Sequence, residues 1–96
     1  MSPLPGDLDE LMRALAHPDR RQFIVACLDE PQAAGDLARL SRLSLASVSE
    51  HLKVLRKVGL LKLTKEGRFW YYRTDSDILR AIERAIGALA RGTHGS

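Results

Sequence analysis

The sequence is poor in cysteine and has no long apolar run, and each shortage excludes a class of protein. Its single cysteine, Cys27, cannot form an internal disulfide. Without a Cys-x-x-Cys pair or a Cys/His cluster, the chain also has no structural zinc module. No run approaches the ~18 apolar residues of a membrane span, and residues 1–7 lack the basic and then apolar order of a signal peptide. We therefore expect a cytoplasmic protein that does not bind membranes.

Patterns typical of catalysis are missing as well. The sequence offers no paired carboxylates for one pocket, no phosphate-binding loop and no Ser/His/Asp arrangement. Its 96 residues are 45% hydrophobic and 28% charged, which is ordinary for a globular protein and provides for one core only. We expect a single domain over residues 1–96 that is not an enzyme and has no cofactor.

Acidic residues are scarce in the middle of the chain. Residues 39–73 hold nine of the fifteen basic residues but only Glu50 and Glu66 of the twelve acidic ones, so this stretch carries +7 and the remainder −4. Because acidic partners at i, i+4 spacing are almost absent, pairing between neighbours does not explain these cations. A solvated basic face is the plain alternative, but the pattern favours contact with the phosphates of duplex DNA.

Apolar spacing predicts four helices before a hairpin. The first starts at Leu8 and ends near His17, and the second begins at Pro18 and stops before Pro31. The second helix is expected to turn four side chains inward: Phe23, Ile24, Cys27 and Leu28. A short third helix over residues 33–40 leads through a tight turn into a fourth over residues 45–58.

The end of the chain is predicted to form a hairpin and a fifth helix. Residues 60–65 and 68–73 are rich in strand formers and are separated by a tight turn at Glu66-Gly67. Four of the five aromatic residues lie in the second strand, Phe69-Trp70-Tyr71-Tyr72, where they could stack on bases of a single strand. Because strand side chains alternate between faces, two of the four are instead expected to pack on the helices and two to lie outside. A fifth helix then runs from about residue 78 to residue 91.

Helices followed by a two-stranded hairpin form a winged helix-turn-helix, so the expected fold is mainly α with a small β-hairpin, in the order α-α-α-α-β-β-α. In such a fold the helix before the hairpin enters the major groove and the hairpin lies over the backbone. We expect eleven residues to contact double-stranded DNA: Arg42, Ser44, Ala46, Ser47, Ser49, Glu50, His51, Lys53, Lys57, Lys65 and Arg68. For Ser44 and Ser47 the alternative is that they only cap the helix.

The apolar stripe of the last helix is large for a domain of this size. Together with the first helix it predicts a two-fold interface in a homodimer. The interface residues are expected to be Leu8, Leu11, Leu15, Ile78, Ile82, Ile86 and Leu89. A dimer would place two recognition helices about one DNA turn, ~34 Å, apart and would read a palindromic operator. The alternative is that the last helix folds back on its own core.

The assembled motifs resemble the ArsR/SmtB family of bacterial winged-helix repressors, from about Leu15 to Arg73. Residues 15–20, Leu-Ala-His-Pro-Asp-Arg, are similar to the start of the family's second helix, and Asp36-Leu-Ala38 to its third. Residues 48–60 are similar to its recognition helix, and Glu66-Gly-Arg68 with Tyr71-Tyr-Arg73 to its wing. The resemblance implies a homodimeric repressor that leaves its operator when an effector, often a metal ion, binds.

The metal ligands that the resemblance would imply are absent. The family's thiolate site uses Cys-Val-Cys directly before the Asp-Leu-Ala segment, and the two cysteine positions are Ala33 and Gly35 here. A second family site lies on the last helix and starts with an aspartate, which Asp77 matches. Its later ligand positions are occupied by Leu79, Ala90 and Thr93. The histidines His17, His51 and His94 are scattered over different elements, and imidazoles must converge before they hold a metal. We therefore expect no metal site.

Several alternatives stay open. A non-metal small-molecule inducer, a redox signal through Cys27 with a partner cysteine in a second subunit, and no effector at all fit the residues equally. Glu50 stands where the family commonly has histidine and could accept a hydrogen bond from cytosine N4. The runner-up function is a winged-helix module that docks protein or RNA and binds nucleic acid without sequence preference.

Overall fold

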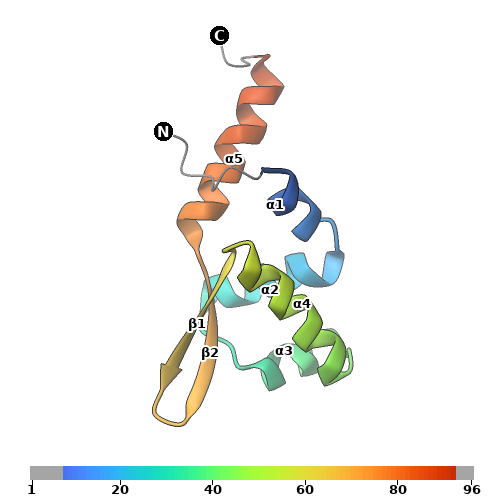
Figure 1. Cartoon of the computed structure of the whole chain (residues 1–96), viewed down its shortest axis with the longest axis vertical. Coiled ribbons are helices and arrows are strands. Elements are labelled where there is room, and N and C mark those ends of the chain that lie inside the picture. Colours follow the sequence, from blue (N-terminus) through green and yellow to red (C-terminus); the bar gives the residue numbers. More distant parts are fainter. Residues whose placement is uncertain (1–7, 93–96) are drawn as a thin grey trace.

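The computed structural model of the chain describes residues 8–92 and has the predicted order of elements (Figure 1). Four helices come first: α1 (Leu8–Ala14), α2 (Pro18–Asp29), α3 (Ala34–Ser41) and α4 (Leu45–Lys57). The strands β1 (Leu61–Glu66) and β2 (Phe69–Thr74) form an antiparallel hairpin, and α5 (Ser76–Arg91) follows. The chain therefore has the winged helix-turn-helix fold. Thr93 and His94, named above, lie outside the described residues.

The first helix is shorter than predicted. It ends at Ala14, and Leu15 and Ala16 form a turn whose N–H groups donate to the carbonyls of Leu11 and Arg13. His17 is extended, with φ −105° and ψ 127°. The residue before a proline is disfavoured in the helical region, so the α1 helix cannot run on into Pro18.

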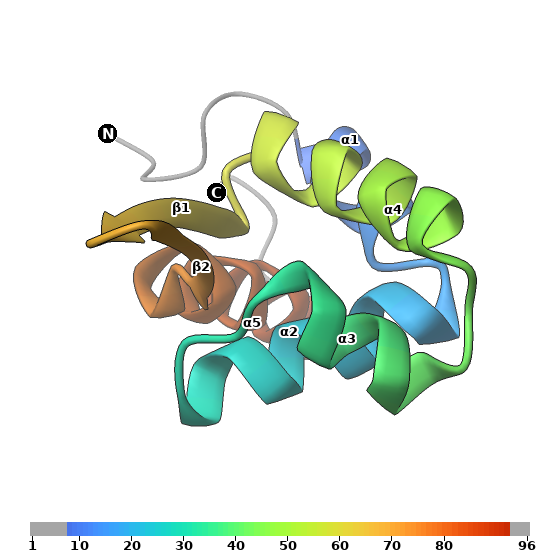
Figure 2. The same cartoon turned by 90° about the horizontal axis from the view of Figure 1, so that it is seen from below.

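The core draws its buried side chains from all five helices and from the base of the hairpin. Figure 2 shows α2, α3 and α4 on one side of the hairpin. Its largest fully buried side chains are Phe23, Leu11, Leu37, Leu52, Leu55, Leu60, Val48 and Cys27. The prediction for Leu28 was wrong, because this side chain is 47% exposed. It lies near the end of α2 beside the start of α5, where no other described element of the chain covers it.

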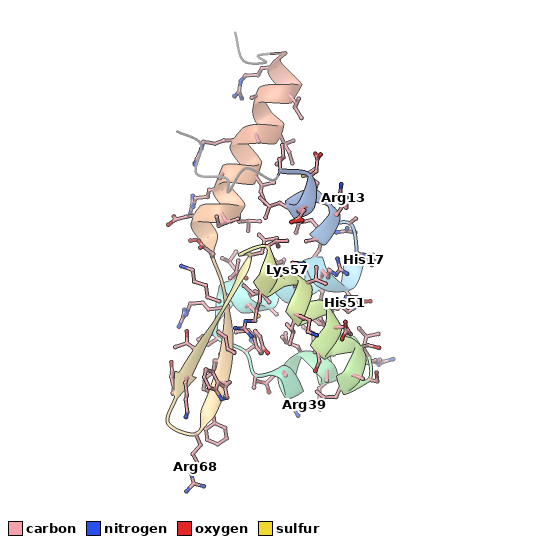
Figure 3. The ribbon with its side chains drawn as sticks, in the orientation of Figure 1. Arg13, His17, Arg39, His51, Lys57 and Arg68 are labelled. Atoms are coloured by element: carbon pink, nitrogen blue, oxygen red, sulfur yellow. The ribbon has the colours of Figure 1, made fainter. Side chains whose placement is uncertain are left out.

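The turn of the hairpin lies one residue later than predicted. Glu66 is the last residue of β1 and pairs with Phe69, so the turn is Gly67-Arg68 rather than Glu66-Gly67. Gly67 has φ +64°, a left-handed conformation that glycine adopts without strain. The shift places Arg68 at the tip of the wing (Figure 3).

Hydrogen bonds from distant segments anchor the base of the wing. Tyr72 of β2 and Gln32, between α2 and α3, exchange backbone bonds of 2.7 and 3.0 Å. The buried Thr74 hydroxyl donates to the Ile24 carbonyl of α2 at 2.7 Å. Asp75 N–H donates to the Leu60 carbonyl at 2.9 Å. These bonds hold the hairpin at a set angle to the helices.

The aromatic residues of β2 are more exposed the farther they lie from the body of the domain, whichever face of the strand they are on. Tyr71 and Tyr72 are half-buried, whereas Phe69 and Trp70 are 62% and 51% exposed. Two of the four aromatic side chains are therefore half-buried, which is the number expected. They are adjacent residues rather than alternate ones, so the expected alternation is wrong. The end of the hairpin projects beyond the helices, so neither face of its last residues is covered (Figure 1).

Candidate nucleic-acid interface

Two serines build the start of the recognition helix α4. Ser44 is the N-cap, and its Oγ accepts a hydrogen bond from Ser47 N–H at 3.1 Å. The two hydroxyls are also bonded to each other, at 3.1 Å. Capping satisfies a backbone donor that would otherwise lack a partner. Both serines therefore have a structural role, and DNA contact by either one stays a prediction.

The connection between α3 and α4 turns at Arg42. This residue has φ +62°, the only positive φ among non-glycine residues in the described part of the chain. Its N–H donates to the Ala38 carbonyl at 2.9 Å and closes the end of α3. The side chain is exposed, so Arg42 combines a turn conformation with a charge beside the start of α4.

The outer face of α4 is polar and basic. Val48, Leu52 and Leu55 point into the core, which leaves four residues at helical spacing on the opposite face: Ala46, Glu50, Lys53 and Lys57. Ser47 and Ser49 are exposed on either side of this stripe. Small residues near the start of the helix permit close approach to base edges, and lysines farther along suit phosphates.

A basic groove separates α4 from the wing. It measures about 430 Å³ and is lined by Ser49, Lys53, Arg56, Lys57 and Tyr72. Three cations, one hydroxyl and a phenol thus converge from two elements. Groups of this kind bind phosphate oxygens, so the groove suits a DNA strand passing between the recognition helix and the hairpin.

The wing carries its own charges. Figure 3 shows Arg68 at the outer end of the hairpin, and the exposed Lys65 lies with its Nζ 5.5 Å from the centroid of the Trp70 ring. This distance is within cation–π range and orients the lysine along β2. Phe69 and Tyr71 are neighbours on the other face, with ring centroids 6.4 Å apart.

Two of the nine cations in residues 39–73 are paired with carboxylates in the described structure. Arg39 pairs with Asp36 one turn earlier on α3, and Lys62 Nζ lies 3.3 Å from Asp75 Oδ2. Both carboxylates lie just outside the basic stretch, which is why its own composition does not reveal these pairs. Such exposed pairs contribute little to stability, but they reduce the charge that Arg39 and Lys62 offer to DNA.

His51 lies on the flank of α4 that faces α2, away from the wing. Its Nδ1 accepts a hydrogen bond from Arg20 Nε at 3.1 Å. Its ring lies 5.8 Å from that of His17 and 6.2 Å from that of Phe23. Figure 3 shows the two histidines close together, so elements that are separate in sequence do bring two imidazoles into contact. Contact between His51 and DNA stays a prediction.

The surroundings of His51 favour its neutral form. Burial lowers the pKa of His51 below its ordinary 6.5, the charges of Arg20 and His17 lower it further, and Asp19 and Glu50 oppose them. The bond from Arg20 also requires an unprotonated Nδ1, which leaves Nε2–H as a donor.

This pKa shift predicts a loss of stability in mild acid. The unfolded chain binds a proton at His51 more readily than the folded one, so the free energy of unfolding should fall as pH drops from about 6.5 toward the lowered pKa. An NMR titration of the His51 ring should give a pKa below 6.5, and Arg20→Gln should raise it. The variant His51→Gln is the control that removes this part of the pH dependence. A wild-type pKa of 6.5 or higher would contradict the assignment.

Other groups of functional interest give no site. Within residues 8–92, no three His, Cys, Asp or Glu side chains gather in a way that could hold a metal ion. No helix in this part of the chain is long and apolar enough to cross a bilayer. Cys27 is fully buried, and burial raises the pKa of its thiol to about 12. The reactive thiolate is therefore almost absent at neutral pH, which argues against a redox signal through the folded chain.

An apolar groove of about 520 Å³ lies on the opposite part of the molecule, between α5, the end of α2 and the turn after α1. It is lined by Leu15, Leu28, Ser76, Leu79, Arg80, Ile82, Glu83 and Ile86. Leu89 is 68% exposed farther along α5. Among the predicted interface residues, Leu11 and Ile82 are already buried within the chain, whereas Ile86 and Leu89 are exposed.

The predicted list omits Arg56 of α4 itself, which lines the groove beside the wing, and two residues that adjoin α4 from other elements. Tyr72 lines the groove beside the wing, and Arg20 holds His51 from a position 31 residues earlier in the chain. Neither is signalled by spacing in the sequence, because only the packing of α2 and β2 against α4 brings them there.

Known proteins with similar sequences and structures are DNA-binding regulators or their domains. Residues 15–64 match a family described as a helix-turn-helix domain. The chain is 43% identical over 80 residues to the HTH-type transcriptional regulator CmtR of Mycobacterium tuberculosis, covering 82% of this chain and 68% of the relative. An ArsR-like transcriptional regulator from Rhodococcus sp. RHA1 superposes with a TM-score of 0.80 and 25% identity, over 88% of this chain and 80% of that one.

A third relative is a winged helix-turn-helix DNA-binding domain from Mycobacterium bovis, described as homodimeric and as a possible ArsR-family regulator. Its TM-score is 0.69 at 25% identity, over 91% of this chain and 80% of that one.

Proposed function

The chain belongs to the ArsR/SmtB family of winged helix-turn-helix regulators and is a DNA-binding transcription regulator, and from this we propose that it acts as a homodimeric repressor of a palindromic operator. The observation that carries the proposal is the continuous basic surface formed by α4, the wing groove and the hairpin. Each protomer would place α4 in the major groove and lay the wing along the adjacent backbone.

The apolar face supports the dimer. The groove along α5 and the exposed Ile86 and Leu89 form a surface that a monomer would leave in water. Leu8, Leu15 and Ile78, which are partly buried, border the same part of the molecule. A second copy on this face would bury the apolar side chains and leave both recognition helices free, with half-sites about 34 Å apart.

Repression by such a dimer would need no further surface. A dimer bound across a promoter excludes other proteins from the same DNA. No metal is assigned as effector, since the family's ligand positions carry other residues and the described chain holds no cluster of ligands.

Binding-site selection from random duplex DNA tests the proposal. We expect enrichment of a palindrome with half-sites about one turn apart. Weak binding without sequence preference, or preferred binding to RNA, would instead favour an interaction module.

Two substitutions on α4 test the contact surface on the selected duplex. Ser49→Ala removes one hydroxyl from each protomer and should weaken binding about fivefold per protomer, or about 25-fold for the dimer, if each hydroxyl makes one hydrogen bond. Lys53→Ala should reduce the slope of log K against log[salt] by about 0.9 for each protomer that loses a phosphate contact. Fluorescence anisotropy measures both, with Gln22→Ala on the exposed face of α2 as the control. Unchanged affinity and slope in both variants would count against DNA recognition by this face.

A further inference from the structure

A second groove borders α4 on the side away from the wing. It measures about 240 Å³ and lies between α1 and the last turns of α4. Its lining residues are Glu10, Arg13, Ala14, Arg20, Val54, Lys57 and Val58. Lys57 also lines the groove beside the wing, so the two grooves meet at this lysine and open along the same helix. The basic surface therefore does not end at α4.

The charges in this groove come from three helices. Arg13 belongs to α1, Arg20 to α2 and Lys57 to α4, against the single carboxylate of Glu10. Figure 3 shows Arg13 and Lys57 on the two helices that form the groove. The four charged lining residues sum to +2, and a surplus of positive charge in one groove attracts an anion.

Arg20 is held in place within this groove. Its Nη1 lies 3.5 Å from the carbonyl oxygens of both Arg13 and Ala14, and its Nε donates to His51. The guanidinium thus fixes the end of α1 against α4. The side chain of Arg13 is exposed and takes no part in these contacts, so it can reach an anion without disturbing the junction.

We propose that the groove between α1 and α4 binds a backbone phosphate of the same duplex, with Arg13 and Lys57 as its ligands. The DNA contact would then run from the wing, across α4, to α1. This inference rests on the proposed function, because it extends the duplex surface. Arginine suits the task, since its planar fork presents paired donors to phosphate oxygens. The position of α1 next to the proposed dimer face would place this contact between the two half-sites.

The salt dependence of duplex binding tests the inference. For Arg13→Gln we expect the slope of log K against log[salt] to fall in magnitude by about 0.9 per contact, or about 1.8 for a dimer. Arg13→Lys should keep the wild-type slope because it keeps the charge. Arg13→Met is a second neutral variant that retains the aliphatic stem. The matched control is Arg84→Gln, an exposed arginine on α5 that lines neither groove, and it should leave the slope unchanged.

The outcomes separate this inference from the proposed function. If the wild type shows no salt-dependent duplex binding, the DNA function fails and the inference fails with it. If the wild type binds normally and both neutral variants keep its slope, only the inference is overturned. An unchanged slope, together with thermal stabilisation of the wild type but not of Arg13→Gln by inorganic phosphate, would assign the groove to a free anion and also overturn it.

Discussion

Replacing Leu89 with arginine is expected to convert the proposed dimer into monomers and to lower affinity for the two-half-site operator by about 100-fold or more. Leu89 is 68% exposed on α5, in line with the apolar groove that reaches Ile86. An arginine there would carry an unpaired charge into an apolar interface, which is costly. A monomer binds only one half-site, so it loses the gain in affinity of about 10²–10⁴ that two linked binding units provide.

Light scattering at micromolar concentration measures the oligomeric state, and fluorescence anisotropy measures the affinity. The control is Val25→Arg, which adds the same charge at an exposed valine of α2 that lines none of the three grooves. An added positive charge alone would strengthen binding to DNA, so the expected weakening has the opposite sign to a general charge effect. A Leu89→Arg protein that remains dimeric would refute this interface.

Replacing Phe23 with alanine is expected to destabilise the domain by about 3–5 kcal/mol. Phe23 is fully buried in the core beneath α4, and its ring packs in a T-shaped arrangement with that of His51. Its removal leaves a cavity between α2 and the recognition helix. Because a domain of this size has only about 5–15 kcal/mol of stability, a large part of the free energy of unfolding would be lost.

Urea unfolding followed by circular dichroism measures this effect. The control on the same helix is Val25→Ala, an exposed position where a change within about 0.5 kcal/mol is expected. A loss of less than about 1 kcal/mol in Phe23→Ala would mean that the core closes over the cavity and that α4 does not depend on this ring.

The sequence pattern predicted the hairpin but not the position of its turn. Strand formers on either side of Gly67 predict the wing, and a two-residue turn containing this glycine fits both Glu66-Gly67 and Gly67-Arg68. Bonds from Gln32 and Ile24 hold β2 at Tyr72 and Thr74, and these partners lie 40 and 50 residues earlier in the chain. Register depends on such distant anchors, so the sequence pattern could not separate the two turns.

The candidate site, like the hairpin, was predicted only in part from the sequence. The basic stretch and the capped helix are local features, and both were correctly located by composition and by the Ser44 cap. The partners of those residues are not local: Arg20 reaches His51 from α2, and Arg13 of α1 lines the same groove as Lys57. The prediction of eleven DNA-contacting residues therefore followed one stretch of chain, whereas the basic surface draws on three helices and the wing.

The sequence by itself determined the class of protein, because periodicity, capping residues and charge segregation act over a few residues at a time. It established a winged helix-turn-helix with a basic face and an apolar last helix. Only the tertiary structure decided which cations are already paired, which leucines remain exposed on α5, and that the basic surface continues past α4 to α1. These properties depend on which distant segments pack together, and burial and electrostatic contact follow distance in space rather than separation along the chain.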